Sequence, residues 1–233
     1  MPKVEPAFLV TCEHASNRVP KSFEPLFRGE RELLRSHRGW DPGARQIARS
    51  IARALDAPLV CGRCTRLLVD LNRSPGNPRV FSRITRRLAQ TERCRLLARF
   101  HEPYWSRIRG MIHRQRGRRV VHVAVHTFAP SLDGRERAVD VGLLYDPARL
   151  SELRLCREWQ LRLAAITVDL RIRRNSPYRG NTDGLPSALR RSFSARRYVG
   201  LELELSQGLY PETARRLARR LGGTLRLAAR TRS

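Results

Sequence analysis

AFLVTCEHASNRVP, residues 7–20, is the stretch that indicates how this chain folds. Its apolar run ends at Val10, a polar cluster follows with His14 as its last member, and turn-forming residues come next. α/β enzymes present ligands and catalytic bases in this way, on loops at the carboxyl edge of a buried sheet. A His at a strand end is often purely structural, so the functional inference depends on the segments that join it.

The remaining chain alternates between strand and helix patterns. Strands are predicted at residues 58–61, 67–71, 120–128, 139–145, 166–172 and 198–206, and helices at 30–37, 44–55, 88–118, 147–165 and 211–227. Residues 20–29, 70–78, 129–131 and 174–182 are predicted to be loops. This alternation indicates the α/β class, and a length of 233 residues fits a single domain over residues 1–233.

The chain is strongly basic, with 47 Lys and Arg against 21 Asp and Glu and a net charge of +26. One interpretation is a surface that binds a polyanion. The other is an Arg-biased composition of solvent-facing helices, which we favour because the Arg residues are scattered and few aromatic residues lie among them. Weak, non-specific association with nucleic acid is still expected.

The five cysteines have no disulfide-framework spacing, which fits a reducing cytoplasm. Cys61 and Cys64 have the C-x-x-C spacing but no second pair, so a zinc knuckle is not favoured. The amino-terminal residues do not resemble a signal peptide, and no apolar run is long enough for a membrane span. The expected compartment is therefore the cytoplasm.

Four polar residues are predicted to meet at the strand ends of one sheet: His14, Asp41, His126 and Glu204. Asp41 precedes Pro42 and is also predicted to cap the helix at 44–55, with Pro42 at its first position. His122 would lie about 13 Å from His126 along the same strand face. We therefore expect His122 to pack or support rather than to ligate the same ion.

Two imidazoles and one carboxylate suit a catalytic Zn²⁺ with one coordination position left for water. Such a metal acidifies its water and polarises a carbonyl, and a nearby carboxylate such as Glu204 can transfer the proton to a leaving nitrogen. That chemistry is the hydrolysis of an amide. Arg66 and Arg73 flank an apolar run with an Asp between them, and they are candidates for gripping an anionic group.

Six segments in this order resemble the N-formylglutamate amidohydrolase family, over about residues 7–210. They are CEHASNRVP (12–20), GWDPGA (39–44), TRLLVDLNR (65–73), HTF (126–128), NSPYRG (175–180) and LELE (201–204). The resemblance implies a three-layer fold, with a mixed, mostly parallel sheet flanked by helices. That fold is similar to the zinc-dependent exopeptidases and amidases, in which the metal lies at the strand ends.

Position by position, the resemblance implies metal ligands at His14, Asp41 and His126, a general base at Glu204, and substrate binding by Arg66, Arg73, Asn175 and Tyr178. Two departures stand out. Thr127 occupies a position where Ser is usual, and residues 205–209 lack the Arg and Asp of an R-Q-D-L-like segment. Glu13 has no strong match, and strand alternation predicts that it faces away from the metal.

The leading hypothesis is a zinc-dependent, or otherwise divalent-metal-dependent, amidohydrolase of N-formyl-L-glutamate or a similar small N-acyl amino acid. A peptidoglycan or peptide amidase is one alternative. The lack of a signal-peptide pattern in the amino-terminal residues argues against a periplasmic role of this kind. A nucleic-acid-binding protein on an inactive hydrolase scaffold is the other, motivated by the charge of +26.

Overall fold

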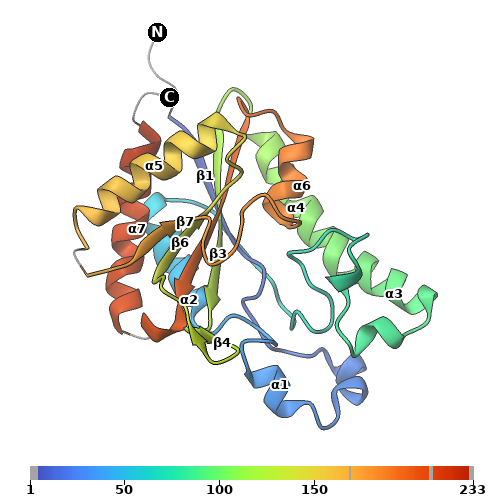
Figure 1. Cartoon of the computed structure of the whole chain (residues 1–233). Coiled ribbons are helices and arrows are strands. Elements are labelled where there is room, and N and C mark those ends of the chain that lie inside the picture. Colours follow the sequence, from blue (N-terminus) through green and yellow to red (C-terminus); the bar gives the residue numbers. More distant parts are fainter. Residues whose placement is uncertain (1–4, 168, 210–211, 231–233) are drawn as a thin grey trace.

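The structure is a computed structural model, and it describes residues 5–167, 169–209 and 212–230. Within these residues, six strands form one mixed sheet in the order β2-β1-β3-β8-β6-β7 (Figure 1). They are β1 (Ala7–Cys12), β2 (Leu59–Cys61), β3 (Val120–Phe128), β6 (Val141–Leu144), β7 (Ile172–Arg174) and β8 (Tyr198–Ser206). Neighbouring strands run parallel except β6 and β8.

Helices cover both faces of the sheet, which forms the middle of three layers (Figure 1). One face packs against α2 (Ala44–Leu55), α5 (Leu150–Ala164) and α7 (Glu212–Arg230), and the other against α4 (Glu102–Arg114) and α6 (Leu185–Ser192). This confirms the predicted mixed, mostly parallel sheet flanked by helices. The likeness to zinc-dependent exopeptidases stays a prediction.

The other elements are short and lie at the periphery. They are α1 (Arg31–Arg35), α3 (Gln90–Leu96), the hairpin strands β4 (Ser131–Leu132) and β5 (Arg135–Glu136), a π turn at Leu97–His101, and 3₁₀ turns at Lys21–Phe27, Pro78–Val80, Thr85–Arg87 and Gln207–Leu209. No helix in the described ranges is both long and apolar enough to cross a membrane.

Strand β3 shows how the sequence positions a site next to a core. Val121, Val123 and Val125 are buried in the core shared with α2, α5 and α7. The residues that alternate with them, His122, Ala124 and His126, point to the face covered by α4 and α6, because successive strand side chains alternate. That second face is apolar at the start of the strands and polar at their carboxyl ends.

Asp41 does not cap α2, contrary to the prediction. The helix begins at Ala44, and its N-cap is Gly43 with φ of 83° and no side-chain cap hydrogen bond. Glycine takes this left-handed conformation readily. The turn leaves Pro42 outside the helix and leaves the Asp41 carboxylate to contact His126 instead.

Some predicted elements differ from the observed ones. Residues 67–71 form turns rather than a strand, and their apolar side chains are buried in the core on the α4 side, which explains the strand-like composition. The strand predicted at 166–172 begins only at Ile172. Residues 20–29 contain a 3₁₀ helix, and α6 and the β4–β5 hairpin were not predicted. Val168, within the strand predicted at 166–172, lies outside the described residues. So does Pro211, the predicted start of the last helix.

Candidate active site

The carboxyl ends of β1, β3 and β8 border a cavity of about 650 Å³. His14 lies just beyond the end of β1, His126 lies near the end of β3, and Glu204 lies near the end of β8. Asp41 reaches the same cavity from the segment before α2. Four residues that are far apart in the sequence therefore meet at one edge of the sheet.

The ring of His14 is held in place by Asp70. Its Nε2 donates to Oδ1 of Asp70 over 2.7 Å, which fixes the proton on that nitrogen. Nδ1 lies 3.4 Å from Oδ2 of Asp41 and has no hydrogen-bond partner among the described residues. A buried ring nitrogen left open in this way, with the other one tied to a carboxylate, is typical of a metal-ligating His.

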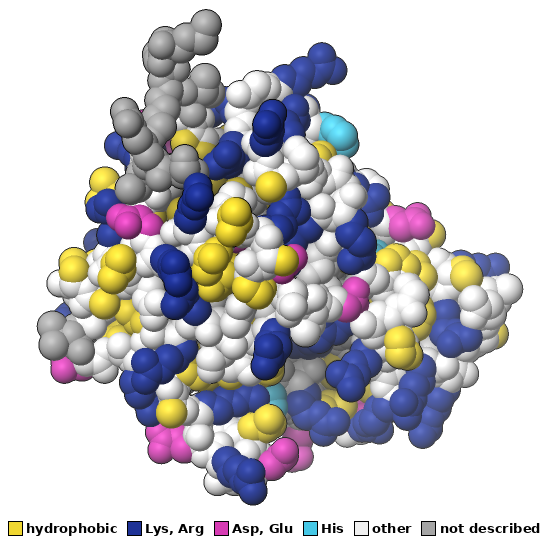
Figure 2. Space-filling model, turned by 45° about the horizontal axis from the view of Figure 1, so that its top comes forward, with side chains coloured by type: hydrophobic (Ala, Val, Ile, Leu, Met, Phe, Trp, Pro, Cys, Tyr) yellow, Lys and Arg dark blue, Asp and Glu magenta, His cyan; other side chains and the backbone are white. Residues whose placement is uncertain are grey.

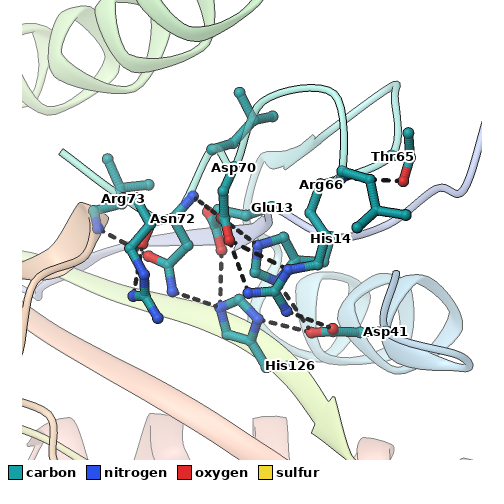
Figure 3. Close-up of polar contacts among 12 residues, drawn as sticks. Glu13, His14, Asp41, Thr65, Arg66, Asp70, Asn72, Arg73 and His126 are labelled. Carbon is teal, nitrogen blue, oxygen red and sulfur yellow. Dashed lines mark hydrogen bonds and ion pairs between the residues drawn. The ribbon is translucent and has the colours of Figure 1, made fainter. Parts of the chain in front are cut away.

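His126 lies between carboxylates on two sides (Figure 3). Its Nδ1 lies 2.8 Å from Oδ2 of Asp41. Its Nε2 lies 3.1 Å from Oε2 of Glu13 and 3.4 Å from Nδ2 of Asn72. Glu13 therefore orients the ring of His126 from behind, as Asp70 orients the ring of His14.

Glu13 lies behind His126 and is not among the described residues that line the cavity, although it contacts a site residue that strand alternation predicted it to face away from. That prediction applied strand alternation between Glu13 and His14, but β1 ends before either residue. Glu13 continues the face of Thr11, the register partner of Ala124 on β3. His126 is the next residue on that face of β3, so the two side chains meet.

His14, Asp41 and His126 form a group that fits a divalent cation. All three residues are buried, and one ligand atom from each lies within 4.8 Å of the other two. Zn²⁺ binds imidazole nitrogen and carboxylate oxygen at about 2.0–2.2 Å, so donors on opposite sides of an ion are separated by about 4 Å or less. The spacing and the donor types therefore suit such an ion.

The electrostatics of this group favour positive charge at its centre. Burial raises the pKa of a carboxyl group, but His14 and His126 hold the pKa of Asp41 below its usual range. Burial lowers the pKa of an imidazole, but hydrogen bonds to Asp41 and Glu13 hold the pKa of His126 well above its usual value. His126 lowers the pKa of the buried Glu13 to about 2. Carboxylates thus surround the imidazoles, as a cation site requires.

Glu204 lies beside His126, because the two are register partners on adjacent parallel strands and share a face. Its side chain is buried, and Oε2 has no hydrogen-bond partner among the described residues. Burial raises the pKa of Glu204 to about 8. Glu202, two residues earlier on the same face, also lines the cavity, and burial raises its pKa as well. Glu204 can therefore exchange a proton near neutral pH.

Arg66 and Arg73 both line the cavity, and both act from loops. Nη2 of Arg66 donates to Oδ2 of Asp70 over 2.8 Å, and its Nη1 lies 3.5 Å from Oδ1 of Asp41. Nη1 of Arg73 donates to the carbonyl oxygen of Asp183 over 2.7 Å. The Arg66 guanidinium therefore contacts two carboxylates of the site, and the Arg73 guanidinium is held at the cavity wall by the Asp183 carbonyl.

Tyr178 also lines the cavity, whereas Asn175 is not among its described lining residues. The Tyr178 hydroxyl accepts a hydrogen bond from Nη1 of Arg137 over 2.9 Å. Oδ1 of Asn175 accepts from the backbone N–H groups of Tyr145 and Gly180 over 3.0 and 3.1 Å. Asn175 therefore braces the loop that carries Tyr178, and its role in substrate binding stays a prediction.

His122 is packed behind the site, as expected from its distance along the strand. Its Nε2 lies 2.8 Å from Oγ1 of Thr11, and its Nδ1 lies 2.7 Å from the hydroxyl of Tyr198. The residue is fully buried, and burial lowers its pKa to about 4. It therefore stays neutral and joins three strands of the sheet.

Three residues of the cavity region were missed by sequence reasoning: Asp70, Asn72 and Asp183. Asp70 could have been found from the sequence, because it is an acidic residue within the apolar LLVDL segment. A carboxylate buried with such a segment needs a hydrogen-bonding or charged partner. Asp183 accepts hydrogen bonds from the backbone of Ser74 and the side chain of Asn77. Its contacts join segments about a hundred residues apart, and no local pattern indicates them.

This chain is similar to known proteins both in sequence family and in structure. A model of the N-formylglutamate amidohydrolase family, FGase, matches residues 7–211. The crystal structure of gene product Atu2144 from Agrobacterium tumefaciens is 27% identical with a TM-score of 0.79, over 96% of this chain and 90% of that one. No curated protein matches.

The N-formylglutamate amidohydrolase from Ralstonia eutropha JMP134 is also similar, at 19% identity and a TM-score of 0.62, over 98% of this chain and 95% of that one. This second likeness concerns the fold. The family match spans most of the chain and includes the cavity residues His14, Asp41, His126 and Glu204. The chain therefore belongs to the N-formylglutamate amidohydrolase family, a family of hydrolases that act on amide bonds.

Proposed function

We propose that this protein is a metal-dependent amidohydrolase that cleaves N-formyl-L-glutamate or a similar small N-acyl amino acid. The observation that carries the proposal is the convergence of His14, Asp41 and His126. The rear nitrogen of each imidazole faces a carboxylate, Asp70 for His14 and Glu13 for His126. This arrangement supports Zn²⁺, or another divalent cation, held by Nδ1 of both rings and by the Asp41 carboxylate.

When bound, the cation would polarise the scissile carbonyl and increase the acidity of water at the site. Glu204 accepts the proton of the attacking water in this proposal, because its carboxyl lies beside His126 and its Oε2 has no hydrogen-bond partner in the part of the chain that the structure describes. The same carboxyl then gives the proton to the leaving amine nitrogen, since one group near its pKa can act in both directions.

Arg66, Arg73 and Tyr178 hold the carboxylates of the substrate in this proposal. All three line the same cavity as Glu204. Guanidinium groups bind carboxylates bidentately, and a substrate fixed at its carboxylates presents its amide in one orientation. Asn175 contributes by holding the loop of Tyr178 in place.

Metal analysis and a formate-release assay test the proposal together. We expect about one zinc ion per chain in purified protein, and loss of both zinc and activity in His14→Ala with the fold retained. Protein that hydrolyses N-formyl-L-glutamate equally well after exhaustive chelation would contradict metal dependence. Retained zinc in a folded His14→Ala variant would contradict the assigned site.

A substrate panel distinguishes this reaction from that of a peptidoglycan or peptide amidase. N-formyl and N-acetyl derivatives of acidic and neutral amino acids are compared with muropeptides at equal concentration. The proposal expects the highest kcat/KM with an acidic N-formyl amino acid, because Arg66 and Arg73 face the cavity. Preference for muropeptides would favour the amidase.

Two further expectations accompany the proposal. A reducing cytoplasm is the proposed compartment, because all five cysteines are free thiols. Weak association with nucleic acid is expected from the net charge of +26 and should disappear as salt rises. Figure 2 shows Lys and Arg side chains spread over most of the face drawn, which favours a diffuse electrostatic contact over a specific one.

A further inference from the structure

The loop of residues 70–74 brings Arg73 to the cavity wall, and its backbone is held from behind by two buried rings. Nε1 of Trp105 donates to the carbonyl oxygen of Leu71 over 2.8 Å. Nε2 of His101 lies 2.7 Å from the carbonyl oxygen of Arg73. Because a carbonyl oxygen only accepts, His101 carries its proton on Nε2 and donates it there.

Both rings come from a helical rod with one irregular turn. Residues Leu97–His101 form a π turn between α3 and α4. Pro103, in the first turn of α4, has no N–H and its ring displaces the carbonyl four residues before it, so the backbone widens at this point. His101 and Trp105 are four residues apart and face the loop together, with ring centroids 4.5 Å apart.

The same loop contacts the site on its other side. Nη1 of Arg73 reaches the carbonyl of Asp183 over 2.7 Å, and Nδ2 of Asn72 lies 3.4 Å from Nε2 of His126 (Figure 3). His101 is itself buried and is not among the described residues that line the cavity. It therefore acts on the cavity through the loop that it contacts.

We propose that His101 is a positioning residue: its Nε2–H holds the Arg73 carbonyl so that the Arg73 guanidinium stays at the cavity wall. This inference rests on the proposed function, in which Arg73 binds a substrate carboxylate. Burial lowers the pKa of His101, which keeps the ring an uncharged donor at neutral pH. A binding residue that moves from its place weakens substrate binding before it changes the chemical step.

Three variants test this role. His101→Leu removes the donor at similar volume, His101→Gln keeps an N–H that can reach the carbonyl, and His113→Leu is the matched control at an exposed position of α4. We expect His101→Leu to raise KM for N-formyl-L-glutamate about five- to tenfold with kcat within about twofold, since one hydrogen bond is lost. His101→Gln should recover most of that loss, and His113→Leu should match the wild type.

Two results would overturn the proposal. One is an unchanged KM in folded His101→Leu, with folding checked by thermal unfolding. The other is an equal loss in His101→Leu and His101→Gln, which would indicate packing rather than a donated hydrogen bond. If His101→Leu does not fold, His101→Asn takes its place, because its shorter amide does not reach the carbonyl.

Glutarate binding, measured by calorimetry, separates this inference from the proposed function. If wild-type protein releases no formate from any N-formyl amino acid, the proposed function fails, and glutarate affinity alone then decides the inference. Affinity about five- to tenfold weaker in His101→Leu than in the wild type supports it. Equal affinity in the two proteins overturns it.

Discussion

The two faces of β3 and β8 differ in chemistry although they belong to the same strands. Toward α2, α5 and α7, Val123 and Leu203 are fully buried in an uninterrupted apolar core. One residue further along each strand, Ala124 and Glu204 point to the opposite face, where the cavity opens. The apolar core on one face of the strands therefore fixes the backbone that carries the site residues on the opposite face. Stability and chemistry should then be separable by neighbouring substitutions.

The largest effect is expected for Glu204→Gln, on the cavity face. Loss of the proton acceptor should lower kcat about 10²–10⁴-fold. The melting temperature should stay close to that of the wild type, because the amide has the same shape and carries no buried charge. Formate release and thermal unfolding measure the two quantities, and Glu136→Gln, at an exposed position of β5, is the control. Near-wild-type kcat in Glu204→Gln would remove this residue from the mechanism.

The neighbouring change on the core face, Leu203→Ala, should have the opposite profile. The side chain is fully buried, and its truncation should lower the free energy of unfolding by about 2–5 kcal/mol. Urea denaturation followed by circular dichroism measures this loss. The kcat/KM of the folded fraction should match the wild type. A large drop in kcat/KM at full folding would show that the two faces are coupled after all.

Acid should destabilise the cavity face through His122. Its pKa falls from 6.5 to about 4 on folding because the ring is buried. Between these values the unfolded chain binds a proton that the folded chain does not, so stability decreases as pH falls through this window. The effect amounts to roughly 3 kcal/mol at its limit. Comparing urea midpoints at about pH 7 and about pH 4 for wild type and His122→Gln measures it. An equal acid-induced decrease in both proteins would contradict this role for His122.

The smallest effect is expected at the cavity rim, for Tyr178→Phe. This change removes the hydroxyl that accepts from Arg137 and keeps the ring over which that guanidinium lies, 5.1 Å from the centroid. We expect KM to rise about two- to threefold at constant kcat, because one exposed hydrogen bond is lost. Steady-state kinetics with N-formyl-L-glutamate measures both constants. A fall in kcat with unchanged KM would place Tyr178 in the chemical step instead.

The fold was predictable where local pattern and tertiary environment agree. The long strands β3 and β8 were predicted at their observed bounds, because an apolar face and strong strand formers coincide there. Residues 67–71 were misassigned since their apolar side chains are buried by a turn, which composition does not distinguish from a strand. The bounds of α2 were predicted correctly, but its N-cap was misassigned, because the left-handed Gly43 and not Asp41 precedes the first helical residue.

The site was predictable to the extent that strand ends mark it. His14 and His126 followed from that rule, and the cavity contains both. The position of Glu13 did not follow from that rule, because the direction of its side chain depends on the residue at which β1 ends. The contact of Asp70 with His14 depends on how a long loop returns to the sheet. Such contacts are set by tertiary packing, which leaves little trace in the spacing of residues.

The direction of β6 has a consequence for how this scaffold can diversify. Because β6 runs against β8, its first residue pairs with Leu205 at the cavity edge. The connection from β3 to β6 therefore never crosses to the other end of the sheet, and it supplies Leu132 and Arg137 to the cavity wall. Insertions or deletions in residues 129–140 could reshape substrate preference during evolution while His126 and Glu204 remain in place.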